Sequence, residues 1–231
     1  SNILELVRIF YRSLKIYSST EKVKELKKMK ISIPIMIHCS INSVNILDRI
    51  FQDNLRYIHC CRNPLDVYDH TLESFTRLYD SAALFTILIN IKSDNEIYHT
   101  FPWFMRSLPL ELLPNRKLTI IENTCLLIAF YTNTVVEKLI KYQNNKNIML
   151  LSFDRLVMEP DIQTDLIFNK FLEVNPNQSR EINKNKYNLP RDISSINEER
   201  QAVIKKISES EIYSPIRDYF NEALNNYLTH F

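Results

Sequence analysis

The sequence predicts an α/β fold in which a parallel β-sheet is flanked by helices. Three short apolar segments, residues 33–37, 55–61 and 147–153, alternate with longer segments whose apolar residues recur at helical spacing. Both faces of the short segments are mostly apolar, as expected of parallel strands that helices cover on either side. A chain of 231 residues can bury a substantial core, so residues 1–231 are expected to form a single domain.

The first of the three predicted strands follows two predicted helices within residues 1–30. In the first of these helices, apolar residues recur every three or four positions: Ile3, Leu6, Val7, Phe10 and Leu14. Pro34 lies near the start of the strand at residues 33–37, and a further helix is predicted over residues 45–51. This helix leads into the second strand.

The second strand, residues 55–61, is followed by Asn63 and Pro64, which break the strand pattern. A helix is predicted to follow over residues 65–79, with proline in its first turn, where a missing N–H costs little. Residues 80–122 contain apolar runs and the only tryptophan, Trp103, without a clear periodic pattern. We interpret them as an insertion that forms either a lid or partner-binding surface or a segment packed on the sheet edge.

The remaining chain continues the alternation of helix and strand. A helix over residues 125–142, a strand over 147–153, a helix over 161–171, a polar loop over 175–192, and helices over 197–207 and 215–228 are predicted. The predicted core therefore consists of residues 31–79 and 123–175, and residues 193–231 supply the C-terminal helices.

The composition is that of an ordinary globular protein. Hydrophobic residues make up 45% of the chain and charged residues 24%, and the net charge of +2 gives no reason to expect a nucleic-acid partner. No segment reaches the roughly 18 apolar residues of a membrane span, and the N-terminus lacks the pattern of a signal peptide. The four cysteines form no C-x-x-C pair, so neither a disulfide framework nor a metal site is expected.

Glycine is absent from the sequence. Average usage of about 7% would give roughly 16 glycines in a chain of this length. The sequence therefore contains no Gly-rich phosphate-binding loop, and in particular no G-x-x-x-x-G-K-[ST] motif. This absence argues against a P-loop kinase.

Arg62 ends the second predicted strand and lies directly before a predicted helix. The N-terminus of a helix presents free N–H groups and a partial positive charge, and a guanidinium group adds a bidentate fork for phosphate. Asp66 would lie in the first turn of the helix, where a carboxylate is favoured. The segment can therefore form an anion site, or an arginine–carboxylate bridge within a helix-capping loop.

The segment RYIHCCRNPLDV resembles the strand–R-[ND]-P-x-D-V–helix segment of sulfotransferases that use 3′-phosphoadenosine-5′-phosphosulfate, and is most similar to the bacterial and tyrosylprotein-type group. IMIHCSINSVNILDRIFQDNLRYIHC upstream and NIMLLSFDRLVMEPDIQTDLIFNKFLEV downstream are similar to family stretches in the same order. The resemblance covers residues 33–174 apart from the insertion at 80–122. It implies the sulfotransferase fold, which is similar to that of P-loop nucleotide hydrolases.

The resemblance also implies a cofactor site. Arg62 would hold the 3′-phosphate of 3′-phosphoadenosine-5′-phosphosulfate. The family serine that shares this task falls on His70, and Thr71 or Ser74 could substitute for it. Phe153 falls on the family tyrosine and would contact adenine.

His38 falls near the place of the family histidine that deprotonates the acceptor hydroxyl. Sulfuryl transfer is an in-line displacement that needs such a base, and α/β proteins place their sites at the carboxyl ends of strands. The alternative is a histidine that is hydrogen-bonded in the core. His59, inside a strand, is expected to be structural, whereas nothing in the surroundings of His99 and His230 indicates a role.

One family feature has no counterpart. The 5′-phosphosulfate loop, of the type R-[ST]-G-[ST]-T, should precede residue 33, and the segment Ser18-Ser19-Thr20 is only a weak candidate. The chain could be a fragment, the loop could have been lost, or the protein could be a sulfotransferase-like protein without activity.

Two functions follow from these observations. The first is transfer of a sulfuryl group to a hydroxyl-bearing acceptor: a carbohydrate, a peptide or a small molecule. The second is a catalytically inactive, sulfotransferase-like subunit of a larger assembly, with a protein partner at the insertion of residues 80–122 and exposed apolar surface around Trp103.

Overall fold

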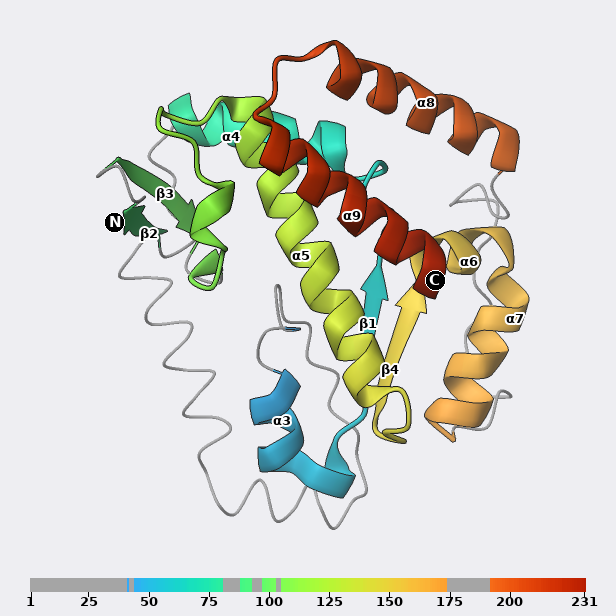
Figure 1. The fold of residues 1–231 in the computed structure, drawn as a ribbon. Helices are drawn as coiled ribbons and strands as arrows, with labels where there is room; N and C mark the ends of the chain where they lie inside the picture. Colours follow the sequence, from blue (N-terminus) through green and yellow to red (C-terminus); the bar gives the residue numbers. More distant parts are fainter. Residues whose placement is uncertain (1–40, 42–43, 81–87, 93–96, 103–104, 174–191) are drawn as a thin grey trace, which may run out of the picture. The chain divides into compact units, whose positions relative to one another are not determined.

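The computed structural model describes residues 41, 44–80, 88–92, 97–102, 105–173 and 192–231 (Figure 1). The chain divides into two compact units, Ser1–His38 and Cys39–Phe231, and all described residues belong to the second. The helices predicted within residues 1–30 and the strand predicted at 33–37 lie outside the described residues. The single domain over residues 1–231 stays a prediction.

Two strands form the parallel sheet on which the candidate site depends. Strand β1 (Tyr57–Cys61) pairs with β4 (Ile148–Ser152), in a register that runs from Tyr57 opposite Ile148 to Cys61 opposite Ser152. The two arrows point the same way in Figure 1. Both strands lie within the predicted ranges, and their parallel pairing confirms the predicted fold class.

Helix α3 (Val44–Phe51) and a short 3-10 helix η2 (Gln52–Asn54) lead into β1. A core cluster forms where α3, the two strands and the later helices meet: Ile41, Val44, Tyr57, Cys61, Val135, Ile148 and Tyr227 are buried together. The apolar residues whose spacing predicted these strands and helices therefore also pack the strands against the helices.

Residues 80–122 contain a β-hairpin that the sequence analysis did not predict. Strand β2 (Leu88–Lys92) pairs with β3 (Tyr98–Pro102) in the antiparallel sense, and the pair forms a sheet separate from β1 and β4. Phe101 of β3 is 2% exposed and belongs to the main hydrophobic core. The hairpin is thus anchored in that core, and neither of its strands forms backbone hydrogen bonds with the parallel sheet. Trp103 lies outside the described residues.

Helix α5 (Ile120–Tyr142) begins five residues earlier than the predicted start at Cys125. The reason is a capping box: the Thr119 hydroxyl accepts from the Glu122 N–H, and the Glu122 carboxylate accepts from the Thr119 N–H. The helix packs against α4 (Tyr68–Asp80) and α9 (Ser214–His230), and α5 and α9 lie side by side in Figure 1. Leu126 and Ala129 of α5 are fully buried in the main core.

Three short helical segments follow β4. They are α6 (Phe153–Met158), α7 (Pro160–Asp165) and the π-helical η5 (Leu166–Phe171). The segment predicted over residues 161–171 is helical, but α6 was missed because the strand was expected to continue through Phe153. Ser152 ends the strand because its hydroxyl accepts from the Arg155 N–H and thereby caps α6.

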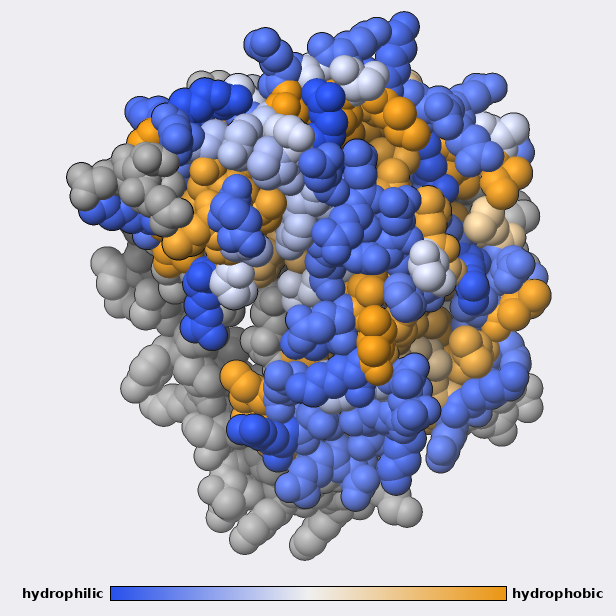
Figure 2. Space-filling view, viewed as in Figure 1, coloured by the Kyte–Doolittle hydropathy of each residue, from blue (hydrophilic) through white to orange (hydrophobic). Residues whose placement is uncertain are grey.

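The chain closes with α8 (Ile193–Glu209) and α9, both a few residues longer than predicted. The buried side chains of α9 recur at helical spacing: Ile216, Phe220, Ala223 and Tyr227. Polar side chains cover the middle of the face in Figure 2, where α9 lies in Figure 1, and apolar side chains form separate groups around it. The helix is therefore amphipathic, with its polar side outward.

A 3-10 helix, η4 (Leu110–Leu112), precedes α5. Within the described parts of the chain, every helix is too short or too polar to cross a membrane.

Candidate functional site

The parallel register places two segments side by side at the carboxyl edge of the sheet: the turn between β1 and α4, and the junction of β4 with the start of α6, here called the two loops. Cys61 pairs with Ser152, so Arg62 and Phe153 are the next residues on neighbouring strands. The guanidinium carbon of Arg62 lies 4.2 Å from the centroid of the Phe153 ring, a cation–π distance. The structure thus brings together two of the residues that the sequence predicted to bind a cofactor.

Arg62 is exposed, and its side chain forms no ion pair or hydrogen bond with the other described residues. Asp66, which the capping-loop alternative would pair with Arg62, forms an ion pair with Arg200 instead. None of the described residues therefore occupies the donors of the Arg62 guanidinium, which can serve an anion.

Asn63 shapes the turn between β1 and α4. The side chain is 1% exposed, its Oδ1 accepts from the Leu65 N–H at 2.9 Å, and its backbone carbonyl accepts from the Asp66 N–H at 3.0 Å. This turn delays α4, which begins at Tyr68 and not at the predicted residue 65. Asparagine before proline is a turn signal, and its weight was underestimated in the prediction.

The first turn of α4 keeps free hydrogen-bond donors. Within the described part of the chain, the N–H groups of Val67, Asp69 and His70 have no acceptor, whereas the Thr71 N–H donates to the Val67 carbonyl at 2.9 Å. Free N–H groups at a helix N-terminus favour anions. They follow Arg62 closely in the chain, so helix and arginine form one candidate anion site.

The three other predicted phosphate ligands lie on α4. His70 is exposed. The hydroxyl of Thr71 donates to the Val67 carbonyl at 2.7 Å, and that of Ser74 donates to the His70 carbonyl at 2.8 Å. In this structure both hydroxyl protons are thus used within the helix. Of the three side chains, only that of His70 is unengaged among the described residues.

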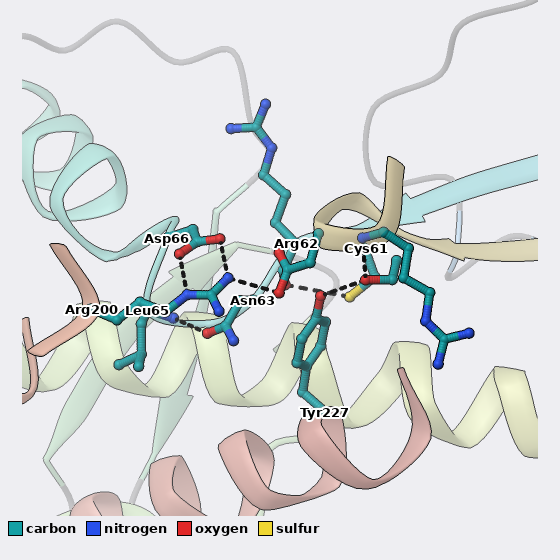
Figure 3. A network of polar contacts seen from close by, with 10 residues as sticks. Cys61, Arg62, Asn63, Leu65, Asp66, Arg200 and Tyr227 are labelled. Atoms are coloured by element: carbon teal, nitrogen blue, oxygen red, sulfur yellow. Dashed lines mark hydrogen bonds and ion pairs between the residues drawn. The ribbon is translucent and has the colours of Figure 1, made fainter. Parts of the chain in front are cut away.

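Arg200 on α8 connects the two loops that carry the candidate site (Figure 3). Its Nε and Nη2 donate to the two carboxylate oxygens of Asp66 at 2.7 and 2.8 Å, and Nη2 also donates to Asp154 at 2.7 Å. The three side chains are only 15 to 20% exposed. Figure 3 shows the Arg62 side chain extending away from this network.

The Arg200 cluster, defined by Arg200, Asp66 and Asp154, holds one positive and two negative charges. Burial raises the pKa of the Asp154 carboxyl, the Arg200 guanidinium opposes this shift, and the neighbouring Asp66 carboxylate adds to it. The same two carboxylates raise the pKa of Arg200. Arg200 therefore stays charged and offsets one of the two negative charges beside Arg62.

A second contact ties α9 to the carboxyl edge of the sheet. The Ser152 hydroxyl lies 3.2 Å from the Tyr227 hydroxyl and also caps α6. The Cys61 thiol donates to the Arg62 carbonyl, and burial raises its pKa to about 12, so it stays protonated. The pKa of the Cys60 thiol is also raised, because desolvation of the thiol outweighs the opposing charge of Arg62. Neither thiol is activated as a nucleophile.

The histidines differ in their surroundings. His38 lies outside the described residues. His59 lies between the hydroxyls of Tyr57 and Tyr131, at 3.4 and 3.2 Å, and burial lowers its pKa to about 4. It is thus a neutral structural residue, as the sequence predicted. Burial also lowers the pKa of His99, which is 4% exposed.

The donors at this edge suit an anion. They are a guanidinium group and backbone N–H groups. In the described ranges no three His, Cys, Asp or Glu side chains are placed to hold a metal ion. The chemistry available is recognition of phosphate beside an aromatic ring.

Asn63 was predicted only as a break in the strand pattern before proline, and Arg200 was not predicted at all. Arg200 lies 134 residues after Asp66 on a helix with an ordinary polar pattern, and no local signal marks it.

Comparison with known proteins supplies an independent observation. A family model described as a sulfotransferase domain matches residues 1–227. The match includes residues 1–32 and 80–122, which the resemblance to short family segments had not covered. No curated protein and no solved structure matches the chain significantly.

Proposed function

The chain belongs to the sulfotransferase family, and from this premise we propose that it transfers a sulfuryl group from 3′-phosphoadenosine-5′-phosphosulfate to a hydroxyl group of its acceptor. The observation that carries the proposal is Arg62: an exposed guanidinium without an ion partner among the described residues, placed against an aromatic ring and before a helix N-terminus. The acceptor class is a carbohydrate, a peptide or a small molecule.

The residues present fit the adenosine 3′-phosphate end of the donor. Arg62 supplies a fork of charged donors, and the first turn of α4 supplies the free N–H groups of Val67, Asp69 and His70. Phe153 gives an aromatic surface for adenine next to the arginine. Its missing hydroxyl, compared with the family tyrosine, removes one polar contact.

When bound, 3′-phosphoadenosine-5′-phosphosulfate supplies the sulfuryl group. The protein must supply a base for the acceptor hydroxyl and positive charge near the leaving phosphate. For the base, the proposal keeps His38, which lies outside the described residues. Arg62 acts in binding and orientation, not in proton transfer, because a guanidinium stays protonated.

The test is calorimetric titration with 3′-phosphoadenosine 5′-phosphate. Arg62→Ala should weaken binding about ten- to hundredfold, because charged hydrogen bonds to phosphate are lost. Binding of adenosine 5′-phosphate, which lacks the 3′-phosphate, should stay the same. Lys146→Ala is the control: this lysine is 77% exposed and precedes β4, at the opposite edge of the sheet. A wild-type chain that does not bind at millimolar concentration contradicts the proposal.

A second candidate is a sulfotransferase-like subunit without activity. His70 in place of the family serine and the Thr71 and Ser74 hydroxyls that donate within the helix favour it. So does the absence of glycine, which leaves no Gly-containing phosphosulfate loop. This candidate predicts binding of 3′-phosphoadenosine 5′-phosphate without its release from the sulfated donor in the presence of carbohydrate, peptide and phenolic acceptors. It also predicts a stable complex with a protein partner in native mass measurement.

A further inference from the structure

We propose that Arg200 is a positioning residue for the 3′-phosphate site: it holds the two loops that carry Arg62 and Phe153 in one arrangement. The inference rests on the proposed function and extends it to a residue on α8, far from the sulfotransferase motif in the sequence. It names a side chain that acts through others and does not itself touch the phosphate.

The contacts of Arg200 reach both loops at once. Asp66 lies four residues beyond Arg62 on the turn after β1, and Asp154 directly follows Phe153 after β4. Arg200 donates to both carboxylates at 2.7 to 2.8 Å. A movement of either loop would lengthen these bonds. The distance between Arg62 and Phe153 is therefore linked to the integrity of the Arg200 cluster.

The charges of the cluster support the same role. Two partly buried carboxylates lie on the loops that are to receive a phosphate, and at 15 to 20% exposure they are screened less than surface groups. Without Arg200 both would oppose the binding of a phosphate. With Arg200 in place, the charges of Arg62, Arg200, Asp66 and Asp154 sum to zero.

The geometry requires the guanidinium fork of arginine. Nε and Nη2 engage the two oxygens of Asp66 in parallel, while Nη2 also serves Asp154. A lysine ammonium group supplies charge from one point and cannot reproduce this pair of parallel bonds. Arg200→Lys therefore keeps the positive charge but removes the parallel pair of hydrogen bonds, so it tests the geometry alone.

The chain offers a matched control on the same helix. Lys206 of α8 pairs with Asp69 of α4 at 2.9 Å, so it also connects these two helices. That pair is 56 and 59% exposed, and among the described residues Lys206 forms no hydrogen bond or ion pair with α6. Lys206→Ala removes an ion pair between α8 and α4 without disturbing the bridge between the two loops.

The experiment compares the wild type with Arg200→Gln, Arg200→Lys and Lys206→Ala. Binding of 3′-phosphoadenosine 5′-phosphate and of adenosine 5′-phosphate is measured at a temperature where circular dichroism shows each variant folded. Arg200→Gln should weaken binding of the first ligand about tenfold or more, since misplaced binding groups lose much of their effect. Arg200→Lys should weaken it about three- to tenfold. Binding of adenosine 5′-phosphate should weaken less than that of the first ligand in both variants, because it has no 3′-phosphate for Arg62 to bind, and Lys206→Ala should match the wild type.

The ratio of the two affinities separates positioning from a merely structural role. If Arg200→Gln lowers the melting temperature but keeps the wild-type ratio, the inference is overturned. If Arg200→Gln does not fold, Arg200→Lys, which retains the charge, is used in its place. A wild-type ratio of the two affinities in Arg200→Lys also overturns the inference. A wild type that binds neither ligand contradicts the proposed function instead.

Discussion

Two arginine–carboxylate clusters connect the C-terminal helices to the rest of the structure, and they differ in which charge lies at the centre. In the Arg200 cluster an arginine of α8 holds two carboxylates. In the second, here called the Glu122 cluster, one carboxylate of α5 is held by Arg116 and by the N–H groups of Thr119 and Tyr213. Tyr213 is the N-cap residue of α9.

The Glu122 cluster is closed. Glu122 is fully buried, its two oxygens accept four hydrogen bonds, and Arg116 binds it in the bidentate manner at 2.7 Å. These bonds lower the pKa of Glu122 to about 2 against the opposing effect of burial. Arg116 is committed to this bridge, so the cluster can fix helices but offers no free cation for a ligand.

The Arg200 cluster also contains a bidentate arginine–carboxylate pair at 2.7 to 2.8 Å, but it lies beside Arg62, a second cation. Arg62 has no ion partner in the described residues, and the cluster holds the turns on which it depends. The comparison teaches that ion pairs alone do not mark a functional site. What distinguishes the proposed site is a charge without an ion partner among the described residues, next to a well-fixed network.

The largest expected effect is on the Glu122 cluster. Glu122→Ala should lower the free energy of unfolding by about 3 kcal/mol, because it removes a buried carboxylate, half of a capping box and the acceptor for the Tyr213 N–H. Arg116→Ala should cost less, since Arg116 is 51% exposed and Glu122 keeps its backbone donors. Urea unfolding of both variants measures the difference.

The comparison would fail if the folded Glu122→Ala variant lost affinity for 3′-phosphoadenosine 5′-phosphate as strongly as Arg200→Gln. Such a result would show that the two clusters act on the ligand site alike. The expected result is unchanged affinity at temperatures where the variant is folded.

The two clusters should respond to acid in opposite directions. The pKa of Glu122 is lowered from 4.5 to about 2, so its stabilising effect is complete above about pH 4.5 and is lost as pH falls toward 2. The pKa of Asp154 is raised, so the folded state takes up its proton first and gains stability as pH falls toward the ordinary value of 3.8.

Urea unfolding between pH 7 and pH 2 tests this pair of signs. The stability advantage of the wild type over Glu122→Gln should shrink on acidification below about pH 4.5. Relative to Asp154→Asn, the wild type should instead gain stability between pH 7 and about pH 4. A parallel decline against both variants would contradict the opposite responses.

Local signals in the sequence account for what could be predicted. The apolar, β-branched segments predicted β1 and β4, and the Arg62-Asn63-Pro64 sequence predicted the turn at their edge. The β2–β3 hairpin and the early start of α5 were not predicted, although local sequence signals indicate both. Ser93-Asp94-Asn95 is a turn signal between β2 and β3, and the spacing of Thr119 and Glu122 is that of a capping box.

The rest depends on distant contacts. Arg62 and Phe153 were each assigned from the resemblance, but their adjacency follows from the strand register, which pairs Cys61 with Ser152. Arg200 is one of several charged residues in α8, and only the packing of that helix decides that it meets Asp66 and Asp154. Sequence patterns encode which faces are apolar, not which arginine pairs with a carboxylate 134 residues away.

Removing the capping hydroxyl of α5 or of α6 should have a smaller effect on the free energy of unfolding. Thr119→Ala should cost about 1 kcal/mol, the usual effect of losing a hydroxyl cap. Ser152→Ala should cost about 2 kcal/mol, because it also leaves the Tyr227 hydroxyl, on a side chain 2% exposed, without its partner. Adding Tyr227→Phe to Ser152→Ala should restore part of the loss. Equal costs in urea unfolding for the two alanine variants would show that the Tyr227 contact contributes nothing.

The smallest effect on stability is expected for Arg62→Ala, within about 0.5 kcal/mol of the wild type. Arg62 is exposed, and among the described residues its side chain forms a cation–π contact with Phe153 but no hydrogen bond or ion pair; such a contact at an exposed site is worth about 0.5 kcal/mol. The same change should give the large loss of 3′-phosphate affinity proposed above. Urea unfolding of this variant therefore measures the contribution of Arg62 to stability, and calorimetric titration measures its contribution to 3′-phosphate binding. A loss of stability above about 1.5 kcal/mol would instead place Arg62 with Glu122, as part of the fold, because a surface residue without such a role rarely costs so much.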